Sequence, residues 1–169
     1  MPRTHRLFLA LWPDDAIRQR IAEHSSSWTL PPGCVRYGPA DWHVTLHFLG
    51  NVATDRIADV AAGVDVPVRR FELVLDRPQL WPRGLAVVCA SAMAPGLQAL
   101  HGRLGQALGE LEQAVEPRPY RPHLTLARRA GAAILPVAPS RIAWPVHGYA
   151  LVVSTGVRAQ RYAVLRQYG

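Results

Sequence analysis

Two nearly identical tetrads, one in each half of the chain, constrain the fold more than any other feature of the sequence. They read HVTL at 43–46 and HLTL at 123–126, and the echo extends over HVTLHFLG (43–50) and HLTLARRA (123–130). Each tetrad lies in an apolar run of the kind that forms strands. Because alternate residues of a strand share a face, each tetrad presents one imidazole and one hydroxyl to one surface and turns its aliphatic residues to the core.

The polar residues of the tetrads form a candidate site for phosphoryl transfer if the two halves pack with pseudo-twofold symmetry. These residues are His43 and Thr45 in the first tetrad, and His123 and Thr125 in the second. One imidazole can accept a proton while the other donates one, and the hydroxyls can donate to phosphate oxygens. A single copy is explained by ordinary half-buried strand residues, since threonine favours strands. Two copies in a chain of only seven histidines argue against coincidence.

The composition is that of a globular protein that attracts anions. Hydrophobic residues make up 49% of the 169 residues and charged residues 18%, which argues against intrinsic disorder. The formal net charge is +7, and a positive field favours polyanionic partners. The 19 basic residues are all arginine, whose planar fork matches phosphate oxygens in pairs. Genomic base composition accounts for such a bias as a whole, so only individual arginines are considered for the site.

Cysteine usage and hydropathy exclude several classes of protein. The two cysteines, Cys34 and Cys89, form no C-x-x-C pattern, which argues against a disulfide framework and against a structural zinc site. No run approaches the roughly 18 apolar residues that span a bilayer, and the first residues lack the features of a signal peptide. We expect a cytoplasmic monomer that makes no contact with membranes.

The order of predicted elements indicates an α+β fold with mainly antiparallel sheets, because strands outnumber helices and do not alternate regularly with them. The segment 77–83 (RPQLWPR) is predicted to be a loop that joins its two flanking strands. Helices are expected at 14–26, 54–62 and 96–112, and strands at 6–12, 42–49, 70–76, 84–90, 120–127, 142–146, 149–154 and 162–166.

The spacing of three further residues relative to the tetrads indicates whether each lies near the site. His47 shares a strand face with His43 and Thr45, so it is predicted to line the cleft beside the substrate. A zinc site built from His43 and His47 is disfavoured, since residues four apart on a strand lie about 13 Å apart; no metal or other cofactor is expected. Phe48 lies on the opposite face of the pleat, which favours core packing, with a nucleobase platform as the alternative. Tyr120 precedes His123 by three residues and is predicted to border the cleft.

The chain resembles the 2H phosphoesterase superfamily, which is named for its paired His-x-Thr/Ser motifs. Within it, the likeness is to the RNA 2′,3′-cyclic phosphodiesterase branch, historically called 2′-5′ RNA ligase. The resemblance covers nearly the whole length. It rests on the segments RLFLALWPDD, WHVTLHFLG, FELVLDR, RPYRPHLTLAR and LVVSTGVRAQRYAVL. It implies a bilobal α+β fold over 1–169, with two pseudo-twofold-related lobes around a central cleft, and metal-independent catalysis.

The resemblance also implies a role for each site residue. His43 becomes the proton donor to the leaving ribose oxygen, and His123 becomes the base that activates water. Thr45 and Thr125 hold phosphate oxygens, and Arg128 neutralises the phosphate. Strict alternation along the strand would place Arg129, rather than Arg128, on the face of His123. The role of Arg128 therefore requires the strand to end or bend after Ala127.

The function implied by the resemblance is hydrolysis of RNA 2′,3′-cyclic phosphate ends to 2′-phosphate ends. Its substrates are RNA ends or small nucleotides that carry the cyclic phosphate. One alternative is 2′-5′ ligation of RNA halves, in which a ribose hydroxyl replaces water; the abundance of water favours hydrolysis unless the two ends are held together. Another is a non-catalytic module that binds RNA ends, against which the paired titratable groups argue.

Overall fold

One large antiparallel sheet organises the protein. The structure, a computed structural model, describes residues 1–169. Seven strands follow the order β10-β9-β1-β3-β7-β6-β5, a short strand β2 pairs with β7, and β4 and β8 form a separate two-stranded sheet. The strands are β1 (Thr4–Leu11), β2 (Val35–Arg36), β3 (Val44–Ala53), β4 (Phe71–Leu75), β5 (Arg77–Trp81), β6 (Leu85–Cys89), β7 (His123–Arg128), β8 (Ile142–Val146), β9 (Tyr149–Val157) and β10 (Gln160–Tyr168).

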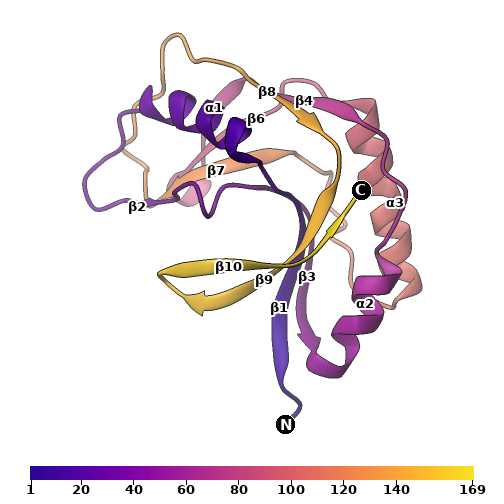
Figure 1. The fold of residues 1–169 in the computed structure, drawn as a ribbon. Helices are drawn as coiled ribbons and strands as arrows, with labels where there is room; N and C mark the ends of the chain where they lie inside the picture. The colour runs from indigo at the N-terminus through magenta and orange to yellow at the C-terminus, as the bar shows by residue number, and fades with distance from the viewer.

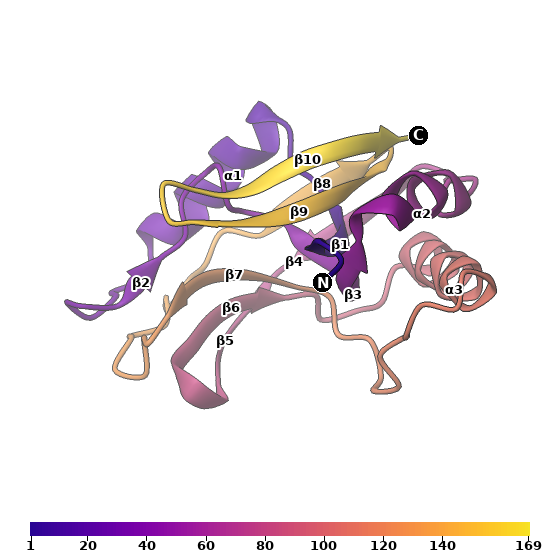
Figure 2. The same ribbon diagram turned by 90° about the horizontal axis from the view of Figure 1, so that it is seen from below.

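Three α-helices cover the sheets from two sides. They are α1 (Asp15–Ser26), α2 (Ile57–Gly63) and α3 (Pro95–Glu110). Helices α2 and α3 lie side by side, and α1 lies near β8 at the other end of the molecule (Figure 1). Seen from below, β9 and β10 form one arm of the large sheet, β7, β6 and β5 form the other, and the arms meet at β1 and β3 (Figure 2). This arrangement confirms the predicted α+β fold with mainly antiparallel sheets and two lobes. None of the three helices combines the length and the hydropathy that a membrane-spanning helix needs.

Helix α3 shows how the sequence pattern produces the core. Its leucines recur every three or four residues, so they fall on one face of the helix. That face is buried at Leu97, Leu100, Leu104 and Leu108, which join a cluster of 32 buried residues between the helices and the sheets. Pro95 stands at the start of the helix, where a missing backbone N–H costs nothing. Helix α1 begins after Asp14, whose carboxylate accepts a hydrogen bond from the Ile17 N–H at 2.9 Å, as the sequence predicts.

The prediction that 77–83 is a loop is wrong for residues 77–81 and holds only for the turn at 82–83. Residues 77–81 form strand β5, and the flanking strands do not pair with each other, because β4 pairs with β8 and β6 pairs with β5 and β7. Strand β5 lies at the edge of the sheet, where Pro78 is tolerated since an edge strand need not donate on both sides. The turn into β6 uses Arg83 and Gly84, both with positive φ (67° and 71°), as a tight hairpin requires.

One buried polar contact ties α1 to the segment before β8. His24 is fully buried, its Nδ1–H donates to the Ser140 carbonyl at 2.6 Å, and its Nε2 accepts from the Trp28 indole N–H at 3.1 Å. This pattern fits only the neutral ring. Burial accordingly lowers the pKa of His24, an effect that the hydrogen bond to Ser140 partly opposes.

Replacing His24 with alanine should destabilise the protein by about 2–4 kcal/mol, because a cavity forms and the Trp28 N–H and Ser140 carbonyl lose their partner. The free energy of unfolding of the native protein should also decrease as the pH falls below about 6.5. The His24 ring then takes up a proton in the unfolded chain but stays neutral in the folded one. Urea unfolding at pH 7.5 and pH 5 measures both effects. The matched control is His147→Ala at an exposed histidine; an equal loss in the control would contradict the structural role of His24.

Candidate functional site

The two tetrads meet where the arms of the sheet join. Strands β3 and β7 pair through a single antiparallel residue pair, Val44 with Leu124, and both side chains are fully buried. Continuing that register sets His43 opposite Thr125, and Thr45 opposite His123. A local twofold axis therefore passes through this pair, and the imidazoles and hydroxyls share the face that the buried residues leave open.

A β-bulge interrupts each tetrad strand at the same place. Thr45 pairs with Ala10 of β1, but the next pair is His47 with Leu9, so Leu46 is an extra residue. In the second copy Thr125 pairs with Val87 of β6 and Ala127 pairs with Ala86, so Leu126 is the extra residue. An inserted residue reverses the alternation of the side chains that follow it, up to the next bulge.

The two bulges decide which later residues reach the cleft. After each threonine, two consecutive residues are buried: Leu46 with His47, and Leu126 with Ala127. The third residue after each threonine then returns to the open face. These residues are Phe48, which is 60% exposed, and Arg128, and both line the cleft with the tetrad residues. The expectation that Phe48 packs in the core is therefore wrong. The bend that Arg128 requires is present, one residue before the position deduced from the sequence.

The prediction that His47 lines the cleft is wrong, because it assumed unbroken alternation. His47 is only 4% exposed and faces α3, where its Nε2–H donates to the His101 carbonyl at 2.9 Å and its ring stacks on that of His101 at 4.0 Å. His43 and His47 lie on opposite faces, so they cannot share a metal ion. More generally, no group of three or more His, Cys, Asp or Glu side chains is arranged to hold one.

Tyr120 also lies outside the cleft, contrary to the prediction from its spacing. Its ring stacks on His101 at 4.0 Å, and its hydroxyl donates to the backbone carbonyl of Thr45 at 2.8 Å. Burial raises the pKa of this hydroxyl. Tyr120 therefore supports the first tetrad from behind rather than from the substrate side.

The cleft between the tetrads has a volume of about 300 Å³ and holds six residues that the sequence analysis considered. It also includes residues that the sequence analysis missed, among them Tyr37, Asp41 and Tyr162. Asp41 could have been found, since it precedes His43 by two residues and alternation extends to it. Tyr37 and Tyr162 come from the segment before β3 and from β10, and no local pattern joins them to the tetrads. The six considered residues are His43, Thr45, Phe48, His123, Thr125 and Arg128.

Both imidazoles are oriented by the same backbone contact. The Nδ1–H of His43 donates to the Asp41 carbonyl, and that of His123 donates to the Arg121 carbonyl, each at 2.7 Å. This contact fixes the tautomer and leaves Nε2 of each ring for chemistry. The Nε2 of His43 lies 3.2 Å from the Thr45 hydroxyl oxygen.

Aromatic side chains surround the two histidines and hold the rings in place. The His43 ring lies 5.0 Å from Phe8, 5.7 Å from Trp12 and 5.1 Å from Tyr162, measured between centroids. The His123 ring lies 4.4 Å from Trp81. These contacts restrict rotation of the imidazoles and exclude water from one side of each ring.

Nearby charges act differently on the two histidines. Burial lowers the pKa of His43; the Asp41 carbonyl and carboxylate raise it, and His123 lowers it. Burial also lowers the pKa of His123, where the Arg121 carbonyl raises it and the Arg121 guanidinium lowers it. The nearby side-chain charges thus differ: a carboxylate raises the pKa of His43, and a guanidinium lowers that of His123, while burial lowers both.

The pKa values of His43 and His123 should both lie below 6.5, and Asp41→Asn should lower that of His43 further while changing that of His123 less. The substitution removes the carboxylate charge and keeps the backbone carbonyl that accepts from Nδ1. Titration of the imidazole nitrogens by NMR measures both values. An unchanged His43 pKa in the variant would show that Asp41 does not distinguish the two rings.

Comparison with known proteins finds similarity to one family over most of the chain. A sequence model described as the 2′-5′ RNA ligase superfamily matches residues 13–158. The chain is 30% identical over 176 aligned positions to an Escherichia coli (strain K12) protein named RNA 2′,3′-cyclic phosphodiesterase, covering 99% of this chain and 98% of the relative. A Thermus thermophilus protein of the same name is 30% identical over 168 positions, covering 88% of this chain and 81% of the relative.

Solved structures share the fold. The crystal structure of E. coli LigT complexed with 3′-AMP superposes with a TM-score of 0.86 at 24% identity, covering 98% of both chains. The crystal structure of the T. thermophilus protein TT0787 gives a TM-score of 0.77 at 25% identity, covering 96% of both chains. The fold is therefore common to these proteins and this chain.

Proposed function

Because the chain belongs to the 2′-5′ RNA ligase superfamily, we propose that it is a phosphodiesterase that opens the 2′,3′-cyclic phosphate at an RNA end to leave a 2′-phosphate. The observation that carries this proposal is the pair of histidines related by the Val44–Leu124 pair, each with Nδ1 bound to a backbone carbonyl. Both tetrads contribute to one cleft, so we treat residues 1–169 as one catalytic domain. The names of the E. coli and T. thermophilus relatives support the same reaction.

The reaction needs one base and one acid on opposite sides of the phosphorus atom. Neutral His123 accepts a proton from water at Nε2, and the water oxygen attacks phosphorus. The bond between phosphorus and the ribose 3′ oxygen breaks, and protonated His43 donates its Nε2 proton to that oxygen. The product carries a 2′-phosphate and a 3′-hydroxyl. Proton exchange with solvent restores both rings, so one water molecule is consumed in each cycle.

The remaining cleft residues stabilise the charge that develops on phosphate. Thr45 and Thr125 donate hydrogen bonds to nonbridging oxygens, and the Arg128 guanidinium offsets the added negative charge. Arg128 and Phe48 occupy equivalent positions in the two copies, so one side of a symmetric frame is charged and the other is apolar. This asymmetry favours one orientation of the ribose. The choice of the 3′ oxygen as the leaving group follows the family resemblance.

Replacing either histidine with alanine should lower kcat/KM for a 2′,3′-cyclic nucleotide by roughly 10²–10⁴, since each substitution removes a proton-transfer partner. The double variant should lose less than the product of the two factors, because the rings act together. Thr45→Ala and Thr125→Ala should each cost roughly 10–10³, the range for one lost donor. His147→Ala, at an exposed position, is the control. Full activity of either histidine variant would contradict the mechanism.

Product analysis tests the reaction itself. A short RNA with a 2′,3′-cyclic phosphate end, incubated with the protein in the presence of EDTA, should yield a 2′-phosphate and a free 3′-hydroxyl. Chromatography against both monophosphate standards identifies the product after nuclease digestion. Mainly 3′-phosphate would refute the orientation of the ribose, and loss of turnover that zinc or magnesium restores would refute the metal-independent mechanism. A joined 2′-5′ product with a second RNA would favour ligation.

A further inference from the structure

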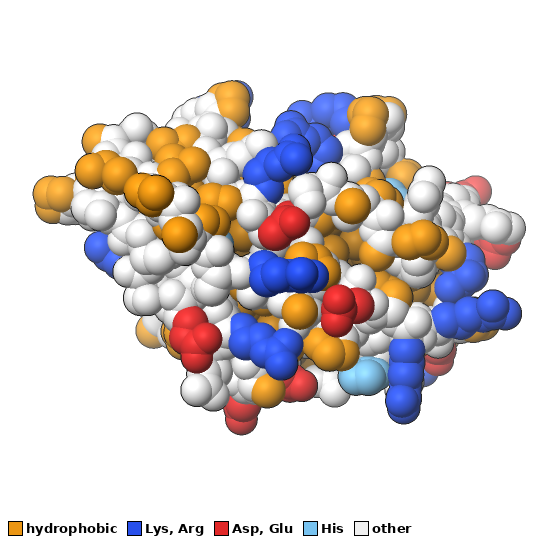
Figure 3. All heavy atoms as spheres, turned by 90° about the horizontal axis from the view of Figure 1, so that it is seen from above, with side chains coloured by type: hydrophobic (Ala, Val, Ile, Leu, Met, Phe, Trp, Pro, Cys, Tyr) orange, Lys and Arg blue, Asp and Glu red, His pale blue; other side chains and the backbone are white.

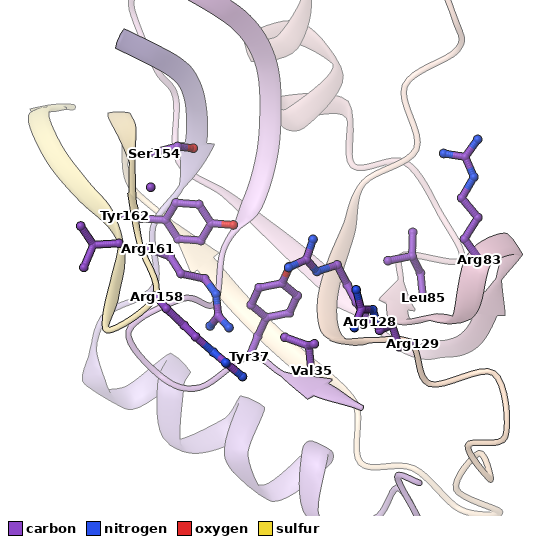
Figure 4. A pocket seen from close by; sticks show the side chains of 12 residues that line it. Val35, Tyr37, Arg83, Leu85, Arg128, Arg129, Ser154, Arg158, Arg161 and Tyr162 are labelled. Carbon is purple, nitrogen blue, oxygen red and sulfur yellow. The ribbon is translucent and has the colours of Figure 1, made fainter. Parts of the chain in front are cut away.

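A second hollow adjoins the catalytic cleft. This arginine groove has a volume of about 760 Å³ and lies between β2, the end of β7 and the turn that joins β9 to β10. It is continuous with the cleft, because both are lined by Tyr37, Leu85, Arg128, Ser154 and Tyr162. Figure 4 shows the labelled side chains that line the groove, with Tyr37 and Tyr162 beside the arginines.

The side chains that line the arginine groove carry several positive charges and no negative charge. Five arginines line it and no aspartate or glutamate does. Only Arg161 has a carboxylate partner, Asp41, at 2.7 Å; the other four make no salt bridge or side-chain hydrogen bond. Elsewhere arginines are interspersed with acidic side chains, as on the face in Figure 3. The four unpaired arginines are Arg83, Arg128, Arg129 and Arg158.

The guanidinium groups gather around one tyrosine. Arg161 lies 4.9 Å and Arg128 lies 5.5 Å from the centre of the Tyr37 ring. Arg129 adopts a left-handed backbone conformation with φ of 53°, which turns the chain at the end of β7 and leaves its side chain on the groove. Arg158 reaches the same region from the β9–β10 turn, whereas Arg83 stands at the far end and points away (Figure 4). Like charges held this close repel one another unless an anion lies between them.

We propose that the arginine groove binds the phosphate groups of the RNA chain on the 5′ side of the cyclic end. This inference rests on the proposed function and extends it. A cyclic phosphate occupies the 2′ and 3′ oxygens, so the rest of the RNA leaves the terminal nucleoside only through its 5′ oxygen. The cleft, at about 300 Å³, is at the small end of the range for ligand sites and suits the terminal nucleotide alone. The next phosphates must lie outside it, and the adjoining wall offers unpaired guanidinium groups.

The chemistry recognised is a phosphate ester on the 5′ oxygen of the terminal nucleoside. It can come from an internucleotide phosphate of RNA or from the 5′-phosphate of a free nucleotide. The groove contains more guanidinium groups than one phosphate requires, so the RNA chain is the source that fits. A chain with two or more phosphates on the 5′ side should therefore bind more tightly than a nucleotide with one.

Binding of product-like ligands tests the inference without depending on turnover. The ligands all end in a 2′-phosphate: a nucleoside, the same nucleoside with a 5′-phosphate, a dinucleotide and a trinucleotide. Affinity should rise by about fivefold or more on adding the first 5′ phosphate, as for one charge-assisted hydrogen bond, and rise again for the trinucleotide. The slope of log K against log salt should steepen by about 0.7 for each phosphate contacted.

The variant Arg129→Gln/Arg158→Gln should abolish most of the gain that the 5′ phosphates bring. The matched control, Arg69→Gln/Arg141→Gln, removes the same charge at exposed positions outside the groove and should keep the gain. Equal binding of all four ligands to the native protein, or the same loss in both variants, would overturn the inference. If the 5′-phosphorylated nucleotide binds tightly and the trinucleotide binds no more tightly, RNA would be overturned as the source of the phosphate. The proposed function would fail in a different way: the protein would show this binding pattern but would not hydrolyse the cyclic ends.

Discussion

The pairing of Val44 with Leu124 is the contact on which the rest of the site depends. It is the single residue pair that joins the two tetrad strands, and both side chains are fully buried between the helices and the sheets. Because an antiparallel pair has a local twofold axis, this contact alone sets each histidine opposite the threonine of the other copy. The aliphatic residues of the tetrads therefore position the polar ones. Their burial fixes the register, and the register fixes the distance between the two imidazoles.

The equivalent bulges at Leu46 and Leu126 bring unlike residues to equivalent positions of a symmetric frame. Both copies bury the residue that follows the bulge and return the next one to the cleft. The frame treats the two positions alike, but the sequence places Phe48 at one and Arg128 at the other. The same holds for the histidines, since each donates Nδ1–H to a carbonyl two residues earlier, and that residue is Asp41 in one copy and Arg121 in the other. Two rings with equivalent geometry therefore have unlike neighbouring charges.

The positive charge of the chain is abundant, and part of it is concentrated on one surface. Around the cleft and the adjoining groove, arginines from β7, from the β9–β10 turn and from β10 converge without acidic partners, apart from the pair between Arg161 and Asp41. That pair links the two regions, because Asp41 also lies beside His43. A phosphate chain bound along this surface would therefore affect both the position of the substrate and the electrostatics of the proton donor.

The sequence by itself determined most of the strands, the two tetrads, the α+β class and the shared strand face of the histidine and the threonine within each tetrad; the pairing of Val44 with Leu124 then brought the two tetrads together. Alternation and hydrophobic burial act locally, so they can be deduced from neighbouring residues. Only the tertiary structure decided which residues line the cleft among His47, Phe48, Tyr120 and Arg128. It also decided that residues 77–81 form a strand. A bulge depends on how a strand is paired with β1 or β6, and the contact of Tyr120 with Thr45 joins segments far apart in the chain. The arginine groove has the same origin: its five arginines come from three separate segments, and no spacing along one strand reveals that folding brings their charges together.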